Sequence, residues 1–308
     1  MKGIGNMKKD LLSCQDLTRT DLENILELSA KLKAGRGKPN QPRPLEGKSV
    51  GTIFAKSSTR TRVSFEVGIY ELGGHAVYMD QGKTQMGRGE TIPDTAHVLE
   101  RYLAGIVIRT FAQSDVEQLA ANAKIPVINA LTDDFHPCQV LTDVFTMLEY
   151  KGKTDGLRMA YLGDGSSNMA NSLMLVSKLA GIDMTIAAPE EFRPRQDLLD
   201  LKFGPGSATW CSSVKDAMQD ADFVYTDVWV SMGFEEESKR RMQILEPYRL
   251  DMNTLKMGKP DCKVLHCLPA HRGDEITDEV MDCPASIVFD QAENRLHVQK
   301  AIMSLLMG

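Results

Sequence analysis

Residues 57–62 (Ser-Ser-Thr-Arg-Thr-Arg) concentrate hydroxyl and guanidinium groups where a helix is expected to begin. They follow an apolar run at 50–54 that predicts a strand, and they open a helical pattern that continues to residue 72. Free backbone N–H groups and the positive end of the helix dipole favour an anion at such a position. The two arginines add forked donors that suit phosphate oxygens. These residues, called the phosphate cradle below, therefore predict a phosphate site.

The phosphate cradle differs from nucleotide-binding loops because it lacks the glycines and the lysine of the P-loop. A capped surface helix with solvated arginines is an equally good interpretation of this segment alone. A second turn, Gly163-Asp164-Gly165, invites a dinucleotide-binding interpretation. Asn168 stands where the third glycine of that motif belongs, so a nicotinamide enzyme is the weaker hypothesis.

Polar side chains recur where the predicted strands end, and ligands of open parallel sheets bind beyond those ends. Each residue taken singly is better explained as a cap or a satisfied core group, but six such positions together indicate function. They are 58–62 after the strand at 50–54, Arg109 after 106–108, His136 after 126–129, Asn168 after 159–162, Asp227 after 223–226, and His266 with Cys267 after 263–265.

Short β-rich runs alternate with longer helical patterns along the whole chain, which predicts an α/β protein with parallel sheets covered on both faces. Further strands are expected at 75–79, 184–187, 208–211 and 287–289. A capping box at Thr20 and Glu23 predicts the start of the first helix, and another at Ser114 and Glu117 predicts the start of a later one. The polar, glycine-bearing break at 151–156 is the best domain boundary.

The composition describes a globular protein of two ordinary domains: 308 residues, 42% hydrophobic, with a net charge of −6. This charge argues against a nucleic-acid footprint or a basic membrane face. No apolar run approaches the roughly 20 residues of a membrane span, and the first residues lack a signal-peptide core. We therefore expect a cytoplasmic protein without a nucleic-acid or membrane partner.

The six cysteines contain no CxxC pair, which favours reduced thiols over a disulfide framework. Cys262, His266, Cys267 and His271 cluster enough to raise the question of zinc. Their spacing matches no structural zinc pattern, and adjacent His-Cys ligands suit a tetrahedral site poorly. We expect no metal.

Four segments together resemble one known family. Residues 58–62 and 135–139 (Phe-His-Pro-Cys-Gln) resemble the carbamoyl-phosphate signature of the aspartate and ornithine carbamoyltransferases. Residues 227–233 (Asp-Val-Trp-Val-Ser-Met-Gly) and 266–269 (His-Cys-Leu-Pro) look like its ornithine branch. The resemblance runs from residue 7 to the last helix, expected at 292–306, and so covers almost the whole chain.

The resemblance implies two similar-sized α/β domains, each a mainly parallel sheet flanked by helices. Residues 1–150 would bind carbamoyl phosphate and residues 151–290 would bind ornithine, while the C-terminal helix, 291–308, would return to the first domain. It also implies a homotrimer with shared active sites and no cofactor. The activity would be transfer of the carbamoyl group from carbamoyl phosphate to L-ornithine, giving citrulline and phosphate in arginine biosynthesis.

The resemblance also implies roles for particular residues. Gln85 would reach the phosphate bound by a neighbouring subunit. Arg109, His136, Cys267 and Asp227 would be catalytic. Ornithine would be bound by Asn168, Asp227, Ser231 and Met232. Carbamoyl phosphate would be bound by Ser58, Thr59, Arg60, Thr61, Gln85, Arg109, His136, Gln139, Cys267, Leu268 and Arg295.

These residue types suit attack of a neutral amine on an activated carbonyl. Arg109, His136 and Thr61 would stabilise the tetrahedral oxyanion, which is the largest contribution in such reactions. The charged stretch 231–248 is expected to close over the site and exclude water. Two alternatives remain open: a related carbamoyltransferase with another amine acceptor, and a binding protein that senses these ligands without turnover.

Overall fold

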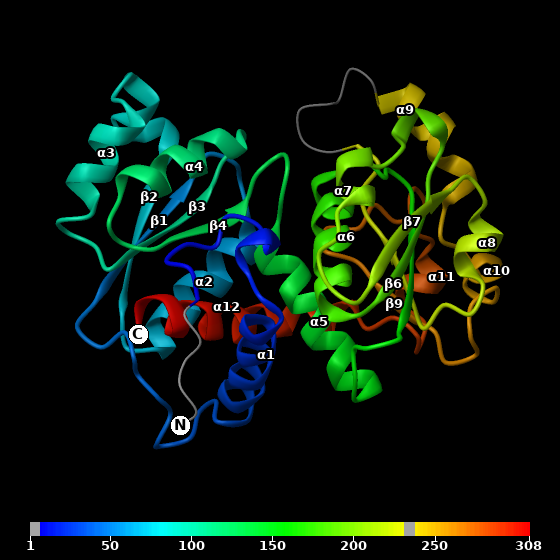
Figure 1. The fold of residues 1–308 in the computed structure, drawn as a ribbon, viewed down its shortest axis with the longest axis horizontal. Coiled ribbons are helices and arrows are strands. Elements are labelled where there is room, and N and C mark those ends of the chain that lie inside the picture. The colour runs from blue at the N-terminus through cyan, green and yellow to red at the C-terminus, as the bar shows by residue number, and fades with distance from the viewer. Residues whose placement is uncertain (1–6, 231–237) are drawn as a thin grey trace. The chain divides into compact units, whose positions relative to one another are not determined.

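The computed structural model describes residues 7–230 and 238–308. The chain divides into two compact units, each with its own parallel sheet (Figure 1). The first unit holds the residues up to 145 together with 293–308, and the second holds 146–292. The division falls inside a helix, six residues before the polar break at 151–156 that the sequence favours as a boundary.

The first unit is built on four parallel strands in the order β2-β1-β3-β4. The strands are β1 (Ser49–Phe54), β2 (His75–Asp80), β3 (Gly105–Arg109) and β4 (Val127–Leu131). The helices are η1 (Cys14–Asp16), α1 (Arg19–Ala34), α2 (Thr59–Glu71), η2 (Gln81–Lys83), η3 (Met86–Arg88), α3 (Ile92–Leu99), α4 (Gln113–Asn122) and α5 (Pro137–Lys151), which crosses into the second unit.

Helices cover both faces of this sheet. On one face, Ile53, Ile106 and Ile108 pack with apolar residues of α3 and α4 in one buried cluster. On the other face lie α1, α2 and the C-terminal helix α12 (Val288–Met307) (Figure 1). Side chains of α12 pack closely on the backbone of α2, because a Cβ at Gly68 would lie only 3.2 Å from Lys300 Cγ. The expected return of the last helix to the first domain is therefore observed.

The second unit is built on five parallel strands in the order β7-β6-β5-β8-β9. The strands are β5 (Arg158–Leu162), β6 (Asp183–Ala187), β7 (Ser207–Cys211), β8 (Phe223–Thr226) and β9 (Lys263–Leu265). The helices are α6 (Asn168–Ala180), η4 (Glu190–Phe192), α7 (Gln196–Asp200), α8 (Val214–Met218), α9 (Ser238–Leu245), η6 (Glu246–Tyr248), α10 (Met252–Leu255) and α11 (Asp278–Met281). Residues of α8, α10 and α11 form one buried cluster with the sheet.

Three local expectations are wrong. Residues 287–289 do not form a strand: Ser286 makes one bridge to Val264, and α12 begins at Val288. The first helix is capped by Thr18, whose hydroxyl accepts from Asp21 N–H, rather than by Thr20. Helix α4 begins one residue before Ser114 and has no side-chain cap. A short apolar triplet, or a hydroxyl residue near a helix start, fits several local structures, so packing decided between them.

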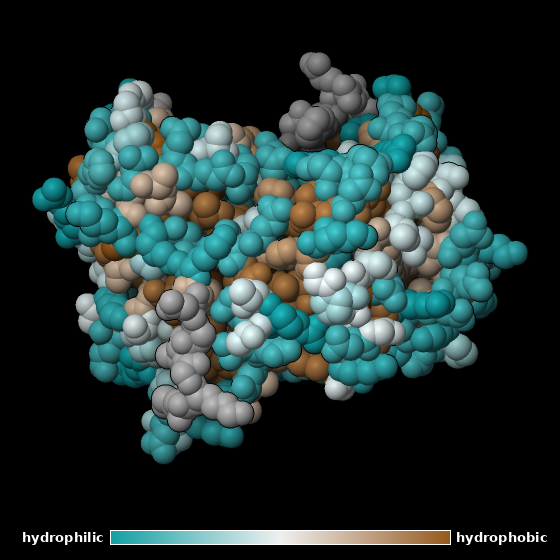
Figure 2. All heavy atoms as spheres, in the orientation of Figure 1, coloured by the Kyte–Doolittle hydropathy of each residue, from teal (hydrophilic) through white to brown (hydrophobic). Residues whose placement is uncertain are grey.

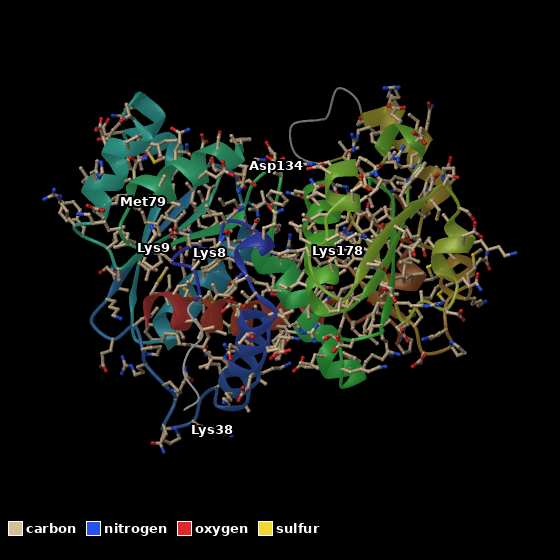
Figure 3. The ribbon with its side chains drawn as sticks, in the orientation of Figure 1. Lys8, Lys9, Lys38, Met79, Asp134 and Lys178 are labelled. Carbon is tan, nitrogen blue, oxygen red and sulfur yellow. The ribbon has the colours of Figure 1, made fainter. Side chains whose placement is uncertain are left out.

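Two lysines close helix ends with their ammonium groups (Figure 3). Lys9 Nζ donates to the carbonyl oxygens of Ala120 and Ala123 at the end of α4, at 3.0 and 2.5 Å. Lys178 Nζ, which is buried, donates to the carbonyl oxygens of Leu198, Leu199 and Leu201 at the end of α7, at 2.6 to 2.8 Å. Cations suit the negative ends of helices, so both residues have a structural role.

The visible surface carries mainly hydrophilic residues, with smaller hydrophobic areas between them (Figure 2). Within the described ranges, none of the helices combines the length and the apolar character needed to cross a lipid bilayer.

Candidate active site

The phosphate cradle is open at the start of α2. Ser58 is the N-cap residue in an extended conformation, and its side chain makes no capping hydrogen bond to the helix. Thr59 is exposed and Arg60 is half-buried in the first turn. The backbone N–H groups of this turn therefore face outward without a side-chain cap, as an anion site at a helix N-terminus requires.

Thr61 connects this turn to two arginines from distant parts of the chain. Its buried hydroxyl accepts a hydrogen bond from Arg295 Nη2 at 2.6 Å and from Arg109 Nη1 at 3.4 Å. Arg295 Nη1 also donates to Gln139 Oε1 at 2.9 Å, and Gln139 Nε2 donates to Asp143 at 2.8 Å. Four elements, α2, β3, α5 and α12, thus bring their predicted residues to one place in the first unit.

His136 is a neutral imidazole at physiological pH. The residue is 3% exposed, and burial lowers the pKa of its imidazole well below the usual value, with the charges of Arg295 and Arg109 acting in the same direction. A neutral imidazole can donate one hydrogen bond without adding positive charge. His136 is therefore suited to polarising a carbonyl beside fixed cations.

The second arginine of the motif has a different environment from Arg60. Arg62 stacks over the Tyr78 ring at 3.6 Å and donates to Glu66 at 2.8 Å. It lines a cavity of about 560 Å³ together with Lys56 and cradle residues 57–59. Arg62 is therefore held by Glu66 and Tyr78, whereas Arg60 lies in the first turn of α2, beside the free backbone N–H groups.

Gln85 lies on the connection between β2 and α3 and is exposed. It lines a different cavity of about 110 Å³, shared with Ile53, Met79 and Leu99 among others. The first unit by itself therefore does not gather Gln85 with the residues around Thr61.

In the second unit, Asp227 and Cys267 meet at the ends of β8 and β9. Cys267 Sγ donates to Asp227 Oδ1 at 3.0 Å, and the backbone N–H of Val228 donates to the same oxygen at 2.8 Å. Asp227 is 8% exposed, and burial raises the pKa of its carboxyl above the usual value. A buried carboxylate beside a thiol is a suitable partner for amine groups.

A buried His266–Glu275 pair holds the loop that carries Cys267. The His266 ring nitrogen Nε2 lies 3.1 Å from Glu275 Oε1, and both side chains are fully buried. His266 Nδ1 accepts from Leu268 N–H at 2.9 Å, while Glu275 Oε1 also accepts from His271 N–H at 2.6 Å. Leu268 adopts a left-handed conformation, φ 58°, which is rare for a branched residue and occurs where the surroundings enforce it.

Sequence reasoning missed Glu275, because a glutamate in the run Arg-Gly-Asp-Glu reads as a solvated loop residue. The only available signal was the apolar Ile276 that follows it.

The set of residues that could hold a zinc ion differs from the one considered in the sequence. Cys262 is buried in the apolar core, whereas Asp227, His266 and Cys267 bring ligand atoms within 4.8 Å of one another.

Asn168 is the first residue of α6 and is half-buried. Ser167, before it, caps this helix by accepting from Ala170 N–H at 3.1 Å. Gly165 is required by close packing, since a Cβ there would lie 2.8 Å from the Phe192 carbonyl oxygen, and this accounts for the glycine without a nucleotide. Ser231 and Met232 lie outside the described residues.

Both groups of residues lie at a point where strand order reverses. In the first sheet β1 is followed along the chain by β2 on one side and by β3 on the other, and the cradle and Arg109 follow β1 and β3. In the second sheet β5 has β6 on one side and β8 on the other, and Asn168 and Asp227 follow β5 and β8. Such switch points are where open α/β sheets bind ligands.

Known proteins match both units. Residues 9–149 match the model of the aspartate/ornithine carbamoyltransferase carbamoyl-P binding domain, and residues 155–306 match that of the Asp/Orn binding domain. An ornithine carbamoyltransferase of Geobacter metallireducens is 49% identical over 303 residues, which is 98% of this chain and 100% of the relative.

Solved structures agree with these matches. The ornithine carbamoyltransferase of Pyrococcus furiosus superposes with a TM-score of 0.94 at 46% identity, covering 99% of each chain. The anabolic ornithine carbamoyltransferase of Campylobacter jejuni has a TM-score of 0.90 at 33% identity, covering 97% of this chain and 99% of that one. With both domains matched in order along one chain, this protein belongs to the aspartate/ornithine carbamoyltransferase family.

Proposed function

We propose that this protein transfers the carbamoyl group of carbamoyl phosphate to the side-chain amine of L-ornithine, giving L-citrulline and phosphate in arginine biosynthesis. The contact between Cys267 and Asp227 is the observation that carries the choice of acceptor. A buried carboxylate can hold an amino acid's α-ammonium group, and a neighbouring thiol offers a weakly polar partner to a neutral amine. The names of the relatives support the same acceptor.

The residues around Thr61 bind carbamoyl phosphate in this proposal. The first turn of α2 and the arginines bind the phosphate, while His136 and Gln139 address the carbamoyl group. Cys267 and Leu268 contribute to carbamoyl binding from the second unit, and Arg295 contributes from the first. Because Arg109 and Arg295 are already fixed through Thr61, little reorganisation is needed when charge develops.

The reaction needs no dedicated base. The neutral δ-amine of ornithine attacks the carbonyl carbon, a C–N bond forms, and an oxyanion develops beside Arg109 and His136. Collapse of this intermediate breaks the bond to the phosphate oxygen, and the leaving phosphate takes the proton of the amine. Asp227 and Cys267 orient the amine, and Asn168 contributes to binding of the amino acid; Ser231 and Met232 are proposed with it from the sequence motif alone.

Assembly and location complete the proposal. The protein acts as a homotrimer in the cytoplasm, where its six free cysteines stay reduced. Gln85 serves a neighbour's phosphate site, which agrees with its exposed position away from Thr61. Mixing inactive Gln85→Ala and Arg109→Ala variants by joint refolding should then restore activity, because some mixed sites carry neither change. Mixtures that stay inactive contradict the shared site.

One assay tests the reaction. Citrulline formation from carbamoyl phosphate is compared with carbamoylation of acetylornithine, putrescine and aspartate at equal concentrations. Ornithine should be the preferred acceptor. Faster turnover with any of the other three amines would replace the proposed acceptor, and binding without turnover of any of them would favour a sensor.

A further inference from the structure

Arg241 of α9 was assigned no role of its own by the sequence, and in the second unit it contacts Asp164, Trp229 and Phe192. Its Nη2 forms a short ion pair with Asp164 Oδ2, its Nε donates to the Trp229 carbonyl oxygen at 2.8 Å, and its guanidinium lies 4.5 Å from the centre of the Phe192 ring. The side chains of Arg241 and Asp164 are only 13% and 10% exposed. Although α9 itself contributes hydrophilic surface (Figure 2), this arginine points inward.

Asp164 shapes the loop that leads to Asn168. Its Oδ1 accepts from the backbone N–H of Ser166 at 2.9 Å and from the Ser166 hydroxyl at 2.6 Å. The Tyr161 hydroxyl donates to the Asp164 carbonyl and lies 3.0 Å from the Ser167 hydroxyl, which caps α6. One carboxylate oxygen of Asp164 thus organises the start of α6 while the other binds Arg241.

Trp229 fixes the chain two residues after Asp227. Its side chain is 2% exposed and packs with Phe192 and Leu245 in a small apolar cluster. The hydrogen bond from Arg241 holds the carbonyl of this same residue. Arg241 therefore ties together the segments that leave β5 and β8, the two neighbouring strands at the switch point of the second sheet.

We propose that Arg241 is a positioning residue for the amino-acid substrate: it holds the chain around Asn168 and Asp227 in the geometry that binds the acceptor. The inference rests on the proposed function. The fork of an arginine can bind a carboxylate and a carbonyl at once, whereas a lysine ammonium lacks the rigid planar arrangement. Misplacement of binding groups by about 1 Å can cost about 100-fold in rate.

The test compares Arg241→Ala, Arg241→Lys and Asp164→Asn with Arg240→Ala. Arg240 is the matched control, because it is the next residue of α9 and forms an exposed ion pair with Glu191 at 2.8 Å. Steady-state kinetics give KM for each substrate, and calorimetry gives the Kd of norvaline, which has the ornithine chain without the δ-amine, at saturating carbamoyl phosphate. A thermal melt of each variant records its stability.

Arg241→Ala should raise KM for ornithine and Kd for norvaline by about tenfold or more, with KM for carbamoyl phosphate within about twofold of wild type. Arg241→Lys should recover part of this loss, Asp164→Asn should reproduce part of it, and Arg240→Ala should be neutral. If Arg241→Ala does not fold, Arg241→Lys and Asp164→Asn decide by the same criterion. Lower melting temperatures with unchanged ornithine KM and norvaline Kd would overturn the inference, leaving a purely structural ion pair.

The two proposals fail differently. Wild-type protein that neither makes citrulline nor binds norvaline overturns the proposed function and this inference together. Active wild-type protein whose Arg241 variants match Arg240→Ala overturns this inference alone.

Discussion

The two switch-point sites differ in the sign of the charge that their side chains carry. In the first unit, the Thr61 hydroxyl accepts from two arginines, and burial lowers the pKa of the His136 imidazole and so favours its uncharged form. In the second unit, burial works against the Asp227 carboxylate and raises its pKa. The first site presents cations to a polyanion, whereas the second holds a buried acid whose charged form a bound ammonium group would stabilise. Variants of each site should therefore lose different substrates and respond differently to pH.

The largest effect is expected from Arg60→Ala, which removes a cation from the first turn of α2 and leaves bound phosphate with an unpaired charge. The expected loss is about 3 to 5 kcal/mol, which is about 200- to 5,000-fold in kcat/KM for carbamoyl phosphate. Arg62→Ala is the comparison and should lose less, because the Arg62 guanidinium is already bound by Glu66 and Tyr78. A loss below tenfold for Arg60→Ala would mark it as a surface residue.

Asp227→Asn should separate the two sites most clearly. Loss of the charged partner of the α-ammonium group should weaken ornithine binding by about 2 kcal/mol, or about 30-fold, with carbamoyl phosphate nearly unaffected. Because the pKa of Asp227 is raised on folding, its charge lowers the stability of the folded protein above that pKa. The same variant should therefore raise the free energy of unfolding at pH 7.5, measured in urea. Equal losses for both substrates would contradict the separation.

His136 should make stability fall in acid. Its folded pKa lies well below the unfolded value of about 6.5, so the unfolded chain binds the proton first as the pH drops. Lowering the pH from 7.5 to 5.5 should therefore lower the free energy of unfolding, by on the order of 1 kcal/mol. His136→Gln should remove that part of the pH dependence, as urea titrations at both pH values can measure. An identical decrease in wild type and variant would show that His136 is not the group responsible.

The smallest effect is expected from Cys267→Ser. It should weaken ornithine binding more than carbamoyl-phosphate binding and shift the pH dependence of kcat/KM for ornithine, because the thiol touches Asp227. Cys211→Ser is the control, since that half-buried thiol donates to the Ser213 carbonyl oxygen within its own turn. Lower thermal stability with wild-type kinetics would make Cys267 structural and sharpen the assignment to Asp227 alone.

The sequence determined where chemistry is concentrated along the chain. The strands before the cradle, Arg109, Asn168, Asp227 and Cys267 were predicted within one or two residues, because buried parallel strands are short apolar runs. The motifs identified the family because residue types and their spacing can be read from the sequence without coordinates. Residues 287–289 show the limit, since the apolar triplet Ile-Val-Phe is as compatible with the first turn of α12 as with a strand.

Only the tertiary structure decided which strand ends are neighbours. The orders β2-β1-β3-β4 and β7-β6-β5-β8-β9 result from long-range packing, and they place the cradle beside Arg109 and Asn168 beside Asp227. Contacts across long separations were equally invisible locally: Arg295 reaches Thr61 across 234 residues, and Arg241 reaches Asp164 across 77. Glu275 looks like an ordinary loop acid until its burial against His266 is known. Such partners depend on burial, which no local pattern around a charged residue records.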